Sequence, residues 1–274
     1  MRYAICNETF GEWDFASVCA TAAELGYGGI EVAPFTLAPR ITDVSVARRG
    51  ELRQQAADAG VAIIGLHWLL AKTEGFMVTS PDPAVREVTA HYLGELARCC
   101  RDLGGDLMVF GSPLQRRIPP GKTLSEATDY AFDTLIRSLP EIEKTGVRVC
   151  LEPLAPSEAD FLTTCAETVA LLDRIDHPNF VLHQDVKAMS SEVEPIPTLI
   201  HKYASHTRHF HANDANRRGP GFGDTDFCPI FAALRETGYG GWVSVEVFDY
   251  TPDPVTIARE SIRYMRECSG ERSA

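Results

Sequence analysis

Four short apolar runs in the second half of the chain each end in a residue that can bind a metal ion. The runs are VRVCLEP, NFVLHQD, TRHFHAND and GWVSVEVF, with the candidate ligands Glu152, Asp185, His211 and Glu246 at their ends. Each run is rich in β-branched or aromatic residues and follows a turn, which is typical of a buried strand. Helical patterns of about 10 to 14 residues separate the runs, so we expect parallel strands. The carboxyl ends of such strands open on one face of a barrel, where the four side chains can meet.

The length of the chain and the order of its elements predict one barrel. The 274 residues match the usual size of a (β/α)₈ barrel, about 250 residues. Eight strand–helix units follow one another from Tyr3 to Cys268, with no long linker or shift in composition. We therefore predict an α/β fold, a single TIM-type (β/α)₈ barrel, as one domain over residues 1–274, with a frayed tail from Ser269. The alternative, a doubly wound open sheet, would splay the four strand ends apart.

Composition and charge exclude several kinds of partner. A net charge of −12 disfavours nucleic acid, whose phosphates require clustered Lys and Arg. No run approaches about 20 apolar residues, so no membrane span is expected. The N-terminal segment MRYAICNETF lacks a long apolar region, so we expect no signal peptide and a cytoplasmic protein. The eight cysteines form no C-x-x-C pattern and are expected to remain thiols.

Three carboxylates and one imidazole at strand ends can surround one divalent cation. Charged groups in such a place need a partner or a metal ion, because burying them bare is very costly. A single glutamate after a strand is usually solvated. Four candidate ligands in successive βα units are much harder to attribute to chance, so the pattern predicts a metal site.

The motifs around these ligands resemble those of the xylose-isomerase-like TIM-barrel superfamily, the sugar phosphate isomerase/epimerase type. Within it the sequence is most similar to ketose 3-epimerases that act on tagatose or psicose. The order of strands and ligands agrees over nearly the whole chain, and the motifs are strongest in the second half. The motifs are LEP at Glu152, HQD at Asp185, HFHAND at His211, NRRGPGFGD from Asn216, and VSVEVF at Glu246.

The resemblance implies a cofactor, an acid–base pair and substrate contacts. The four strand-end residues would bind one divalent metal ion, Mn²⁺, with Co²⁺ or Mg²⁺ as alternatives. The two glutamates, Glu152 and Glu246, would also be the acid–base pair. Glu158 and Arg217 fall where the family contacts its small-molecule sugar substrate. The family resemblance also implies a homo-oligomer, a dimer or a tetramer.

One position departs from the epimerase pattern. The epimerases have a substrate-contacting histidine three residues after the aspartate ligand, and this chain has Ala188 there, in the run DVKAM. Lys187 beside it can supply a hydrogen-bond donor of different shape and charge, which makes it a substrate-binding candidate. Because a lost donor changes which hydroxyl groups a pocket accepts, we expect free fructose and psicose to be poor substrates. A substituted or shorter keto-sugar is expected to be preferred.

These residues support proton-transfer chemistry next to a ketone. A divalent cation on the ketone and hydroxyl oxygens of a keto-sugar would stabilise an enediolate. In our hypothesis one of Glu152 and Glu246 removes the proton and the other returns one to the opposite face, which gives epimerisation. Return to the neighbouring carbon gives aldose–ketose isomerisation instead, and the sequence leaves both outcomes open.

Further residues near the predicted strand ends are weaker candidates. His67, at the end of the third strand, is a candidate for the substrate pocket, with capping or packing as the alternative. His209 is either a supporting group or a barrel histidine, and His183 is interpreted as a packed or supporting residue. The two arginines of GSPLQRR hold an anionic group or lie in a solvated loop. Three aromatic residues can exclude water from the pocket: Trp13, Trp68 and Phe248.

Other functions compatible with the pattern stay open. A metal-dependent lyase or dehydratase acting on a keto-sugar or a 3-keto-glycoside would use the same enediolate and then expel a leaving group. A hydroxypyruvate-type isomerase is a further alternative. A DNA-repair nuclease would need more ligands and a basic groove, which the net charge of −12 opposes. A non-enzymatic barrel would be expected to lack the ligands.

Overall fold

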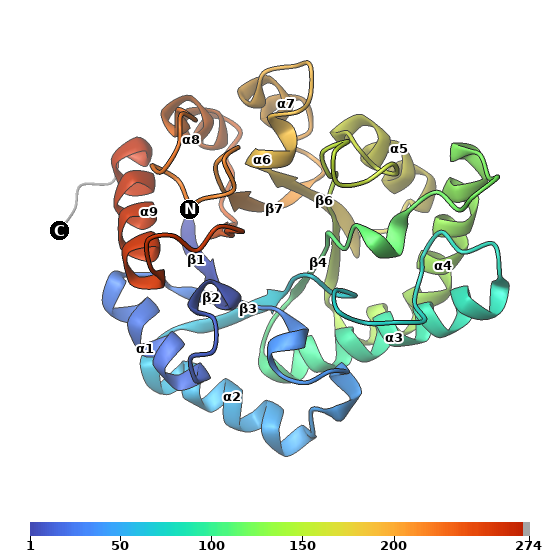
Figure 1. The fold of residues 1–274 in the computed structure, drawn as a ribbon, viewed down its shortest axis with the longest axis horizontal. Coiled ribbons are helices and arrows are strands. Elements are labelled where there is room, and N and C mark those ends of the chain that lie inside the picture. The colour runs from blue at the N-terminus through green and yellow to red at the C-terminus, as the bar shows by residue number, and fades with distance from the viewer. Residues whose placement is uncertain (271–274) are drawn as a thin grey trace.

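The computed structural model describes residues 1–270 and shows a closed barrel of eight parallel strands in chain order. The last strand closes the barrel on the first, with Arg2 opposite Trp242. Figure 1 looks into this barrel, with the helices arranged in a ring around the strands. The predicted (β/α)₈ fold is confirmed. The strands are β1 (Arg2–Cys6), β2 (Gly29–Val32), β3 (Ala62–Leu66), β4 (Leu107–Phe110), β5 (Arg148–Leu151), β6 (Phe180–Asp185), β7 (Thr207–Ala212) and β8 (Trp242–Val245).

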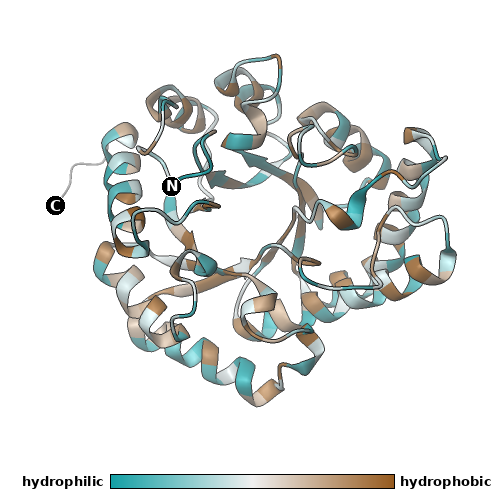
Figure 2. Cartoon of the chain, viewed as in Figure 1, coloured by the Kyte–Doolittle hydropathy of each residue, from teal (hydrophilic) through white to brown (hydrophobic). Residues whose placement is uncertain are grey.

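Helices follow the strands and pack their apolar sides against the barrel, while hydrophilic residues lie on the outer side of the ring (Figure 2). Within residues 1–270, no helix is both long enough and apolar enough to cross a membrane. The α-helices are α1 (Phe15–Leu25), α2 (Val46–Ala59), α3 (Pro83–Leu103), α4 (Leu124–Thr145), α5 (Cys165–Ile175), α6 (Val186–Met189), α7 (Ile196–Lys202), α8 (Phe227–Glu236) and α9 (Pro254–Ser269). Short 3₁₀ turns are η1 (Asn7–Phe10), η2 (Pro34–Thr36), η3 (Ile41–Asp43) and η4 (Leu114–Arg116).

Capping residues fix where several helices begin and end. The Asp14 carboxylate accepts a hydrogen bond from the Ser17 N–H at 3.0 Å at the start of α1. Helix α4 passes through Pro140 without interruption. The Thr123 capping box secures its first turn, and α4 packs along α3. Helix α9 extends to Ser269, and the rest of the predicted frayed tail, residues 271–274, lies outside the described residues.

Buried polar side chains gather at the carboxyl ends of the strands. All six residues of β6 are buried, including the terminal sequence HQD. In Figure 2 the ends of β6 and β7 are hydrophilic, whereas strands across the barrel are largely hydrophobic. Polar groups buried in this way must be paired with one another or with a ligand. The fold therefore concentrates its buried charge on the face that was predicted to hold the site.

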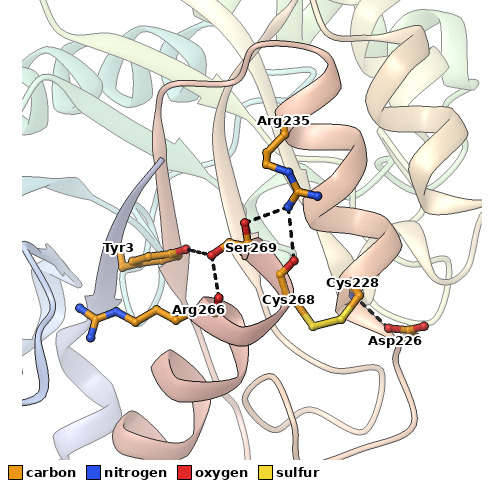
Figure 3. The surroundings of a disulfide bond; sticks show 7 residues. All are labelled: Tyr3, Asp226, Cys228, Arg235, Arg266, Cys268 and Ser269. Carbon is orange, nitrogen blue, oxygen red and sulfur yellow. Dashed lines mark hydrogen bonds between the residues drawn. A yellow bond between two sulfur atoms is a disulfide. The ribbon is translucent and has the colours of Figure 1, made fainter. Parts of the chain in front are cut away.

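Two cysteines differ from the sequence-based expectation. Cys228, near the start of α8, forms a disulfide with Cys268, in the last turn of α9, 40 residues later in the chain (Figure 3). Arg235 donates to the main-chain oxygens of Cys268 and Ser269, at 3.3 and 3.1 Å, and so joins the same two helices. The expectation of eight thiols was wrong for this pair, because the packing of α8 on α9 cannot be seen in cysteine spacing. The other six cysteines are free and buried.

Candidate active site at the carboxyl ends of the strands

The four predicted ligands lie at the ends of the last four strands. Glu152 directly follows β5, Asp185 ends β6, and Glu246 directly follows β8. His211 is the last but one residue of β7 and lies opposite Asp185 in the strand register. All four side chains are buried, with residue exposures between 0% and 5%. The structure thus places the predicted residues on one face of the barrel.

Donor atoms from these residues converge, and one further histidine joins them. The converging atoms lie within 4.8 Å of one another and come from Glu152, His183, Asp185 and His211. Glu246 adjoins this group, since its Oε2 lies 3.3 Å from Nδ1 of His211. From the sequence, His183 was interpreted as a packed or supporting residue and was not expected among the converging donors. His183 is therefore an additional candidate ligand.

Several of these atoms are buried without a hydrogen bond to any described residue. Nδ1 of His211 and Oε2 of Glu246 face each other at 3.3 Å, but outside hydrogen-bonding geometry. Both ring nitrogens of His183 also lack a hydrogen-bond partner among the described residues. Buried polar atoms without partners cost free energy. A divalent cation with oxygen and nitrogen ligands would satisfy them, so the residues present fit such an ion.

The surroundings of the two candidate catalytic glutamates shift their pKa values in opposite directions. Burial, followed by the charges of Glu246 and Asp185, raises the pKa of Glu152 well above its usual value. Burial would also raise the pKa of Glu246, but the neighbouring His211 and His67 bring it well below its usual value. Without a metal ion, these shifts favour the protonated form of Glu152 and the ionised form of Glu246.

Glu31, on β2, holds His211 from across the barrel. Nε2 of His211 donates to the Glu31 carboxylate, whose two oxygens lie 3.2 and 3.1 Å away. Nε2 of His209 donates to Oε2 of the same carboxylate at 2.8 Å. All three side chains are fully buried. Because Glu31 occupies Nε2, the Nδ1 of His211 is left facing Glu246 and the donor cluster. The only sequence signal for Glu31 was a carboxylate inside the otherwise apolar strand GIEV.

Two residues that follow β3 contact Glu246. The indole N–H of Trp68 donates to Oε1 of Glu246 at 2.6 Å. Nδ1 of His67 lies 3.3 Å from the same oxygen, and its Nε2 lies 2.9 Å from the carboxylate of Glu8. His67 is fully buried. The structure thus places His67 and Trp68 against the glutamate that is predicted to act on the substrate.

The loop after β4 supports Glu152 in a way that the sequence did not reveal. Arg116, one of the two arginines of GSPLQRR, is fully buried and donates to the main-chain oxygens of Phe110 and Glu152. Its burial lowers the pKa of the guanidinium to about 10. Gly111 lies against the Glu152 carboxylate, which a Cβ at that position would strike. Arg116 therefore links the ends of β4 and β5 through hydrogen bonds to their main chains. It is not a solvated loop residue.

A comparison with known protein families identifies the barrel. Residues 19–268 match the family described as xylose isomerase-like TIM barrel. The chain belongs to this family. The match covers nearly all of the strand–helix units, including the four strand ends described above. It confirms the family that the sequence motifs suggested.

Curated relatives within the xylose isomerase-like family are epimerases. The chain is 28% identical over 245 residues to a D-psicose 3-epimerase of Ruminiclostridium cellulolyticum, covering 86% of this chain and 80% of that relative. It is 28% identical over 252 residues to an L-ribulose 3-epimerase of Methylomonas, covering 87% and 81%. A 3-dehydro-D-guloside 4-epimerase of Escherichia coli is 29% identical over 156 residues, covering 56% and 59%. These relatives confirm the predicted isomerase class.

Solved structures of the family share the fold at low sequence identity. A crystal structure of a D-psicose 3-epimerase obtained in the presence of D-fructose aligns with a TM-score of 0.86 and 22% identity, covering 98% of this chain and 100% of that one. A 3-keto-D-glucoside 4-epimerase of E. coli aligns with a TM-score of 0.84 and 20% identity, with the same coverage. Both comparisons confirm the barrel.

Ala188, the departure from the epimerase motif, lies in the one-turn helix α6 directly after β6. Its N–H donates to Oδ1 of Asp185 at 2.7 Å, and Asn213 donates to the other carboxylate oxygen at 2.6 Å. These contacts orient the aspartate and leave the short Ala188 side chain buried, at 3% exposure. The position thus still supports Asp185 through its main chain, although it offers no side-chain donor.

Two predicted substrate-binding residues, Lys187 and Glu158, are paired with each other. The Lys187 ammonium donates to the Glu158 carboxylate at 2.6 Å and lies 4.7 Å from the centre of the Phe248 ring. Burial would lower the pKa of Lys187, but Asp185 and Glu158 raise it above its usual value, so the group stays charged. The charges of Asp185 and Glu152 act on Lys187, which places the pair near the donor cluster.

Arg217 lies at the rim of the same face. Its backbone has a positive φ of 73°, and its carbonyl accepts from the N–H groups of Phe248 and Asp249 at 2.9 and 3.0 Å. The guanidinium carbon lies 5.9 Å from the centre of the Phe248 ring. The next residue, Arg218, is paired with Asp249 at 2.9 Å. The loop thus places Arg217 beside the Phe248 ring and Arg218 beside the Asp249 carboxylate.

Proposed function

We propose that this protein is a divalent-metal-dependent epimerase or isomerase of a keto-sugar. The observation that carries the proposal is the convergence of buried strand-end donors, several of which, on His183, His211 and Glu246, have no hydrogen-bond partner among the described residues. The epimerase relatives support the same class of reaction. In this proposal Glu152, Asp185, His211 and Glu246 hold the ion, with His183 as a further candidate. Manganese as the metal, the homo-oligomer and the cytoplasmic location stay predictions.

In the proposed mechanism the protein side chains remove a proton from one face of the substrate carbon and deliver another proton to the opposite face. The bound cation would supply Lewis-acid stabilisation of the enediolate. One of Glu152 and Glu246 takes the proton from the carbon next to the ketone, and the other donates a proton to the opposite face. Trp68 and His67 hold the carboxylate of Glu246 in place. Arg217, and the pair of Lys187 with Glu158, would bind sugar hydroxyl groups.

The test is proton–deuterium exchange in D₂O over a panel of ketoses, keto-acids and 3-keto-glycosides. An epimerase or isomerase incorporates deuterium into the product beside the ketone, and the product keeps all its substituents. Loss of a substituent would instead support the lyase or dehydratase, a second candidate that the departure at Ala188 favours. A hydroxypyruvate-type isomerase would exchange with the short keto-acids. No exchange with any member of the panel would contradict the proposed function.

Lys187→Met should lower kcat/KM for the preferred substrate more than for fructose. The charged donor near the cluster is lost, and only a substrate that meets it will be affected. Free fructose and psicose are expected to be poor substrates of the unaltered protein. The matched control is Lys202→Met, because Lys202 is a half-exposed lysine that is paired with Glu194 at the surface. If fructose or psicose reacts as well as any other member of the panel, the departure at Ala188 has no functional meaning.

Glu31→Gln should weaken metal binding about 10-fold to 100-fold, because partners that orient a ligating histidine commonly contribute that much. The measurement is titration calorimetry with Mn²⁺, supported by metal content after dialysis. Glu31→Asp keeps the charge and should recover part of the affinity. Thermal unfolding of each variant shows whether the barrel is intact. Unchanged affinity in a folded Glu31→Gln variant would show that Glu31 does not position His211.

A further inference from the structure

A cavity of about 650 Å³ opens between the segments that follow β1, β2 and β3. It lies within the range of about 300 to 1,000 Å³ that is usual for small-molecule pockets. Five aromatic residues line it: Trp13, Phe15, Phe35, Trp68 and Tyr250. Trp13 and Tyr250 are 44% and 46% exposed, and they are the only exposed aromatic residues among the large hydrophobic ones that the structure describes. Exposed aromatic rings that share one cavity indicate a binding surface.

Two residues connect this cavity to the candidate active site. Trp68 lines the cavity and donates to Glu246 at 2.6 Å. Glu8 also lines the cavity, and its Oε2 lies 2.9 Å from Nε2 of His67, whose other nitrogen faces Glu246. The cavity therefore adjoins the candidate active site, with Trp68 and the Glu8–His67 contact between it and Glu246.

Glu8 is buried without the hydrogen bonds that a carboxylate needs. Its residue exposure is 8%, and neither carboxylate oxygen makes a hydrogen bond to a described residue. The nearby Nε2 of His67 lies outside hydrogen-bonding geometry. A carboxylate can only accept hydrogen bonds, so its partners in a ligand are O–H or N–H donors. Beyond its contact with His67, Glu8 therefore points to a ligand that presents such donors.

The remaining lining residues favour a neutral ligand. Glu8, Glu12 and Asp14 contribute carboxylates, which would repel an anion. The two cations of the lining are already engaged: Arg48 is paired with Glu51 at 2.9 Å, and the Lys72 ammonium lies 4.0 Å from the centre of the Phe35 ring. Aromatic faces suit the apolar C–H surface of a sugar ring, and carboxylates suit its hydroxyl groups.

We propose that this cavity binds a glycosyl substituent, so that the substrate is a keto-glycoside with two sugar rings. The inference rests on the proposed function, since the keto ring occupies the site between Glu152 and Glu246. The second ring lies against Trp13 and Tyr250, and its hydroxyl groups donate to Glu8. The missing histidine at Ala188 agrees with a substrate that is held mainly through its substituent.

The test compares substrates that have the same keto ring and different substituents. Deuterium exchange is measured for a methyl 3-keto-glucoside, an aryl 3-keto-glucoside and a 3-keto-disaccharide. The disaccharide should have the highest kcat/KM. Trp13→Ala should lower the ratio of kcat/KM for the disaccharide to kcat/KM for the methyl glycoside about tenfold, because one aromatic contact with the second ring is lost. Val88→Ala removes an equally exposed apolar residue of α3 and should leave the ratio unchanged.

The outcomes separate this inference from the function on which it rests. Exchange with free ketoses or the methyl glycoside, with no gain from the second ring and no effect of Trp13→Ala on the ratio, overturns the glycosyl site and leaves the epimerase intact. A clear preference for the aryl glycoside overturns the sugar assignment in favour of an aromatic substituent. Absence of exchange with every substrate overturns both proposals. Fluorescence titration with the non-reacting parent disaccharide measures its binding independently of turnover. This binding should be lost in Trp13→Ala.

Discussion

Replacing Glu152 or Glu246 by Gln should lower turnover about 10²-fold to 10⁴-fold, the usual contribution of a general acid or base. The amide keeps the shape of the side chain but can neither take up nor donate the reacting proton. Turnover is measured at saturating Mn²⁺, so that activity lost through weaker metal binding is not mistaken for activity lost with the acid or base. Circular dichroism and thermal unfolding should show an intact barrel in both variants.

The matched control for these two variants is Glu260→Gln. This carboxylate lies on the outer helix α9, paired with Arg263 at 2.8 Å, and surface pairs of this kind contribute little to stability. Its loss should leave turnover unchanged. Near wild-type activity in either Glu152→Gln or Glu246→Gln, with metal bound, would show that the two-glutamate mechanism is wrong.

Removing divalent metal ions should lower activity about 100-fold or more, since Lewis-acid stabilisation is worth several kcal/mol. Dialysis against a chelator followed by return of Mn²⁺, Co²⁺ or Mg²⁺ identifies the effective ion. Metal content by mass spectrometry should fall and recover together with activity. Full activity in protein without detectable metal would refute the metal site.

Metal affinity should also fall as the pH is lowered. Glu152 has a pKa raised by burial and by its carboxylate neighbours. Burial would lower the pKa of His211, but the charges of Glu31 and Glu246 raise it well above its usual value. Both shifts favour the protonated forms when no metal is bound, and a cation competes with those protons. Calorimetry in buffers with different ionisation enthalpies should detect protons released on binding, and an affinity independent of pH would contradict this account.

Sequence patterns predicted the features that depend on local order along the chain. Strands ending at Asp185 and beside Glu152 could be identified because apolar runs and turn residues mark them directly. Their convergence followed from the geometry of parallel strands in a barrel.

Contacts between distant parts of the chain could not be predicted in this way. Glu31 and His211 are 180 positions apart, and only closure of the barrel brings them together. The pairing of Cys228 with Cys268 depends on how α8 packs against α9. The sequence left Arg116 as either an anion-binding or a solvated loop residue, because nothing nearby in the sequence shows that its guanidinium donates to the main chain of two strand ends.

The contact between Glu31 and His211 shows that the two halves of the barrel contribute different residues to the candidate site. The four strand-end donors come from β5 to β8, whereas Glu31 on β2, with His67 and Trp68 after β3, comes from the first half. A protein reduced to its C-terminal half would keep every candidate ligand but lose the residues that orient His211 and Glu246. Reactivity is thus a joint property of both halves, and exchanging one half for that of a related barrel would preserve it only if the incoming half supplies an equivalent carboxylate.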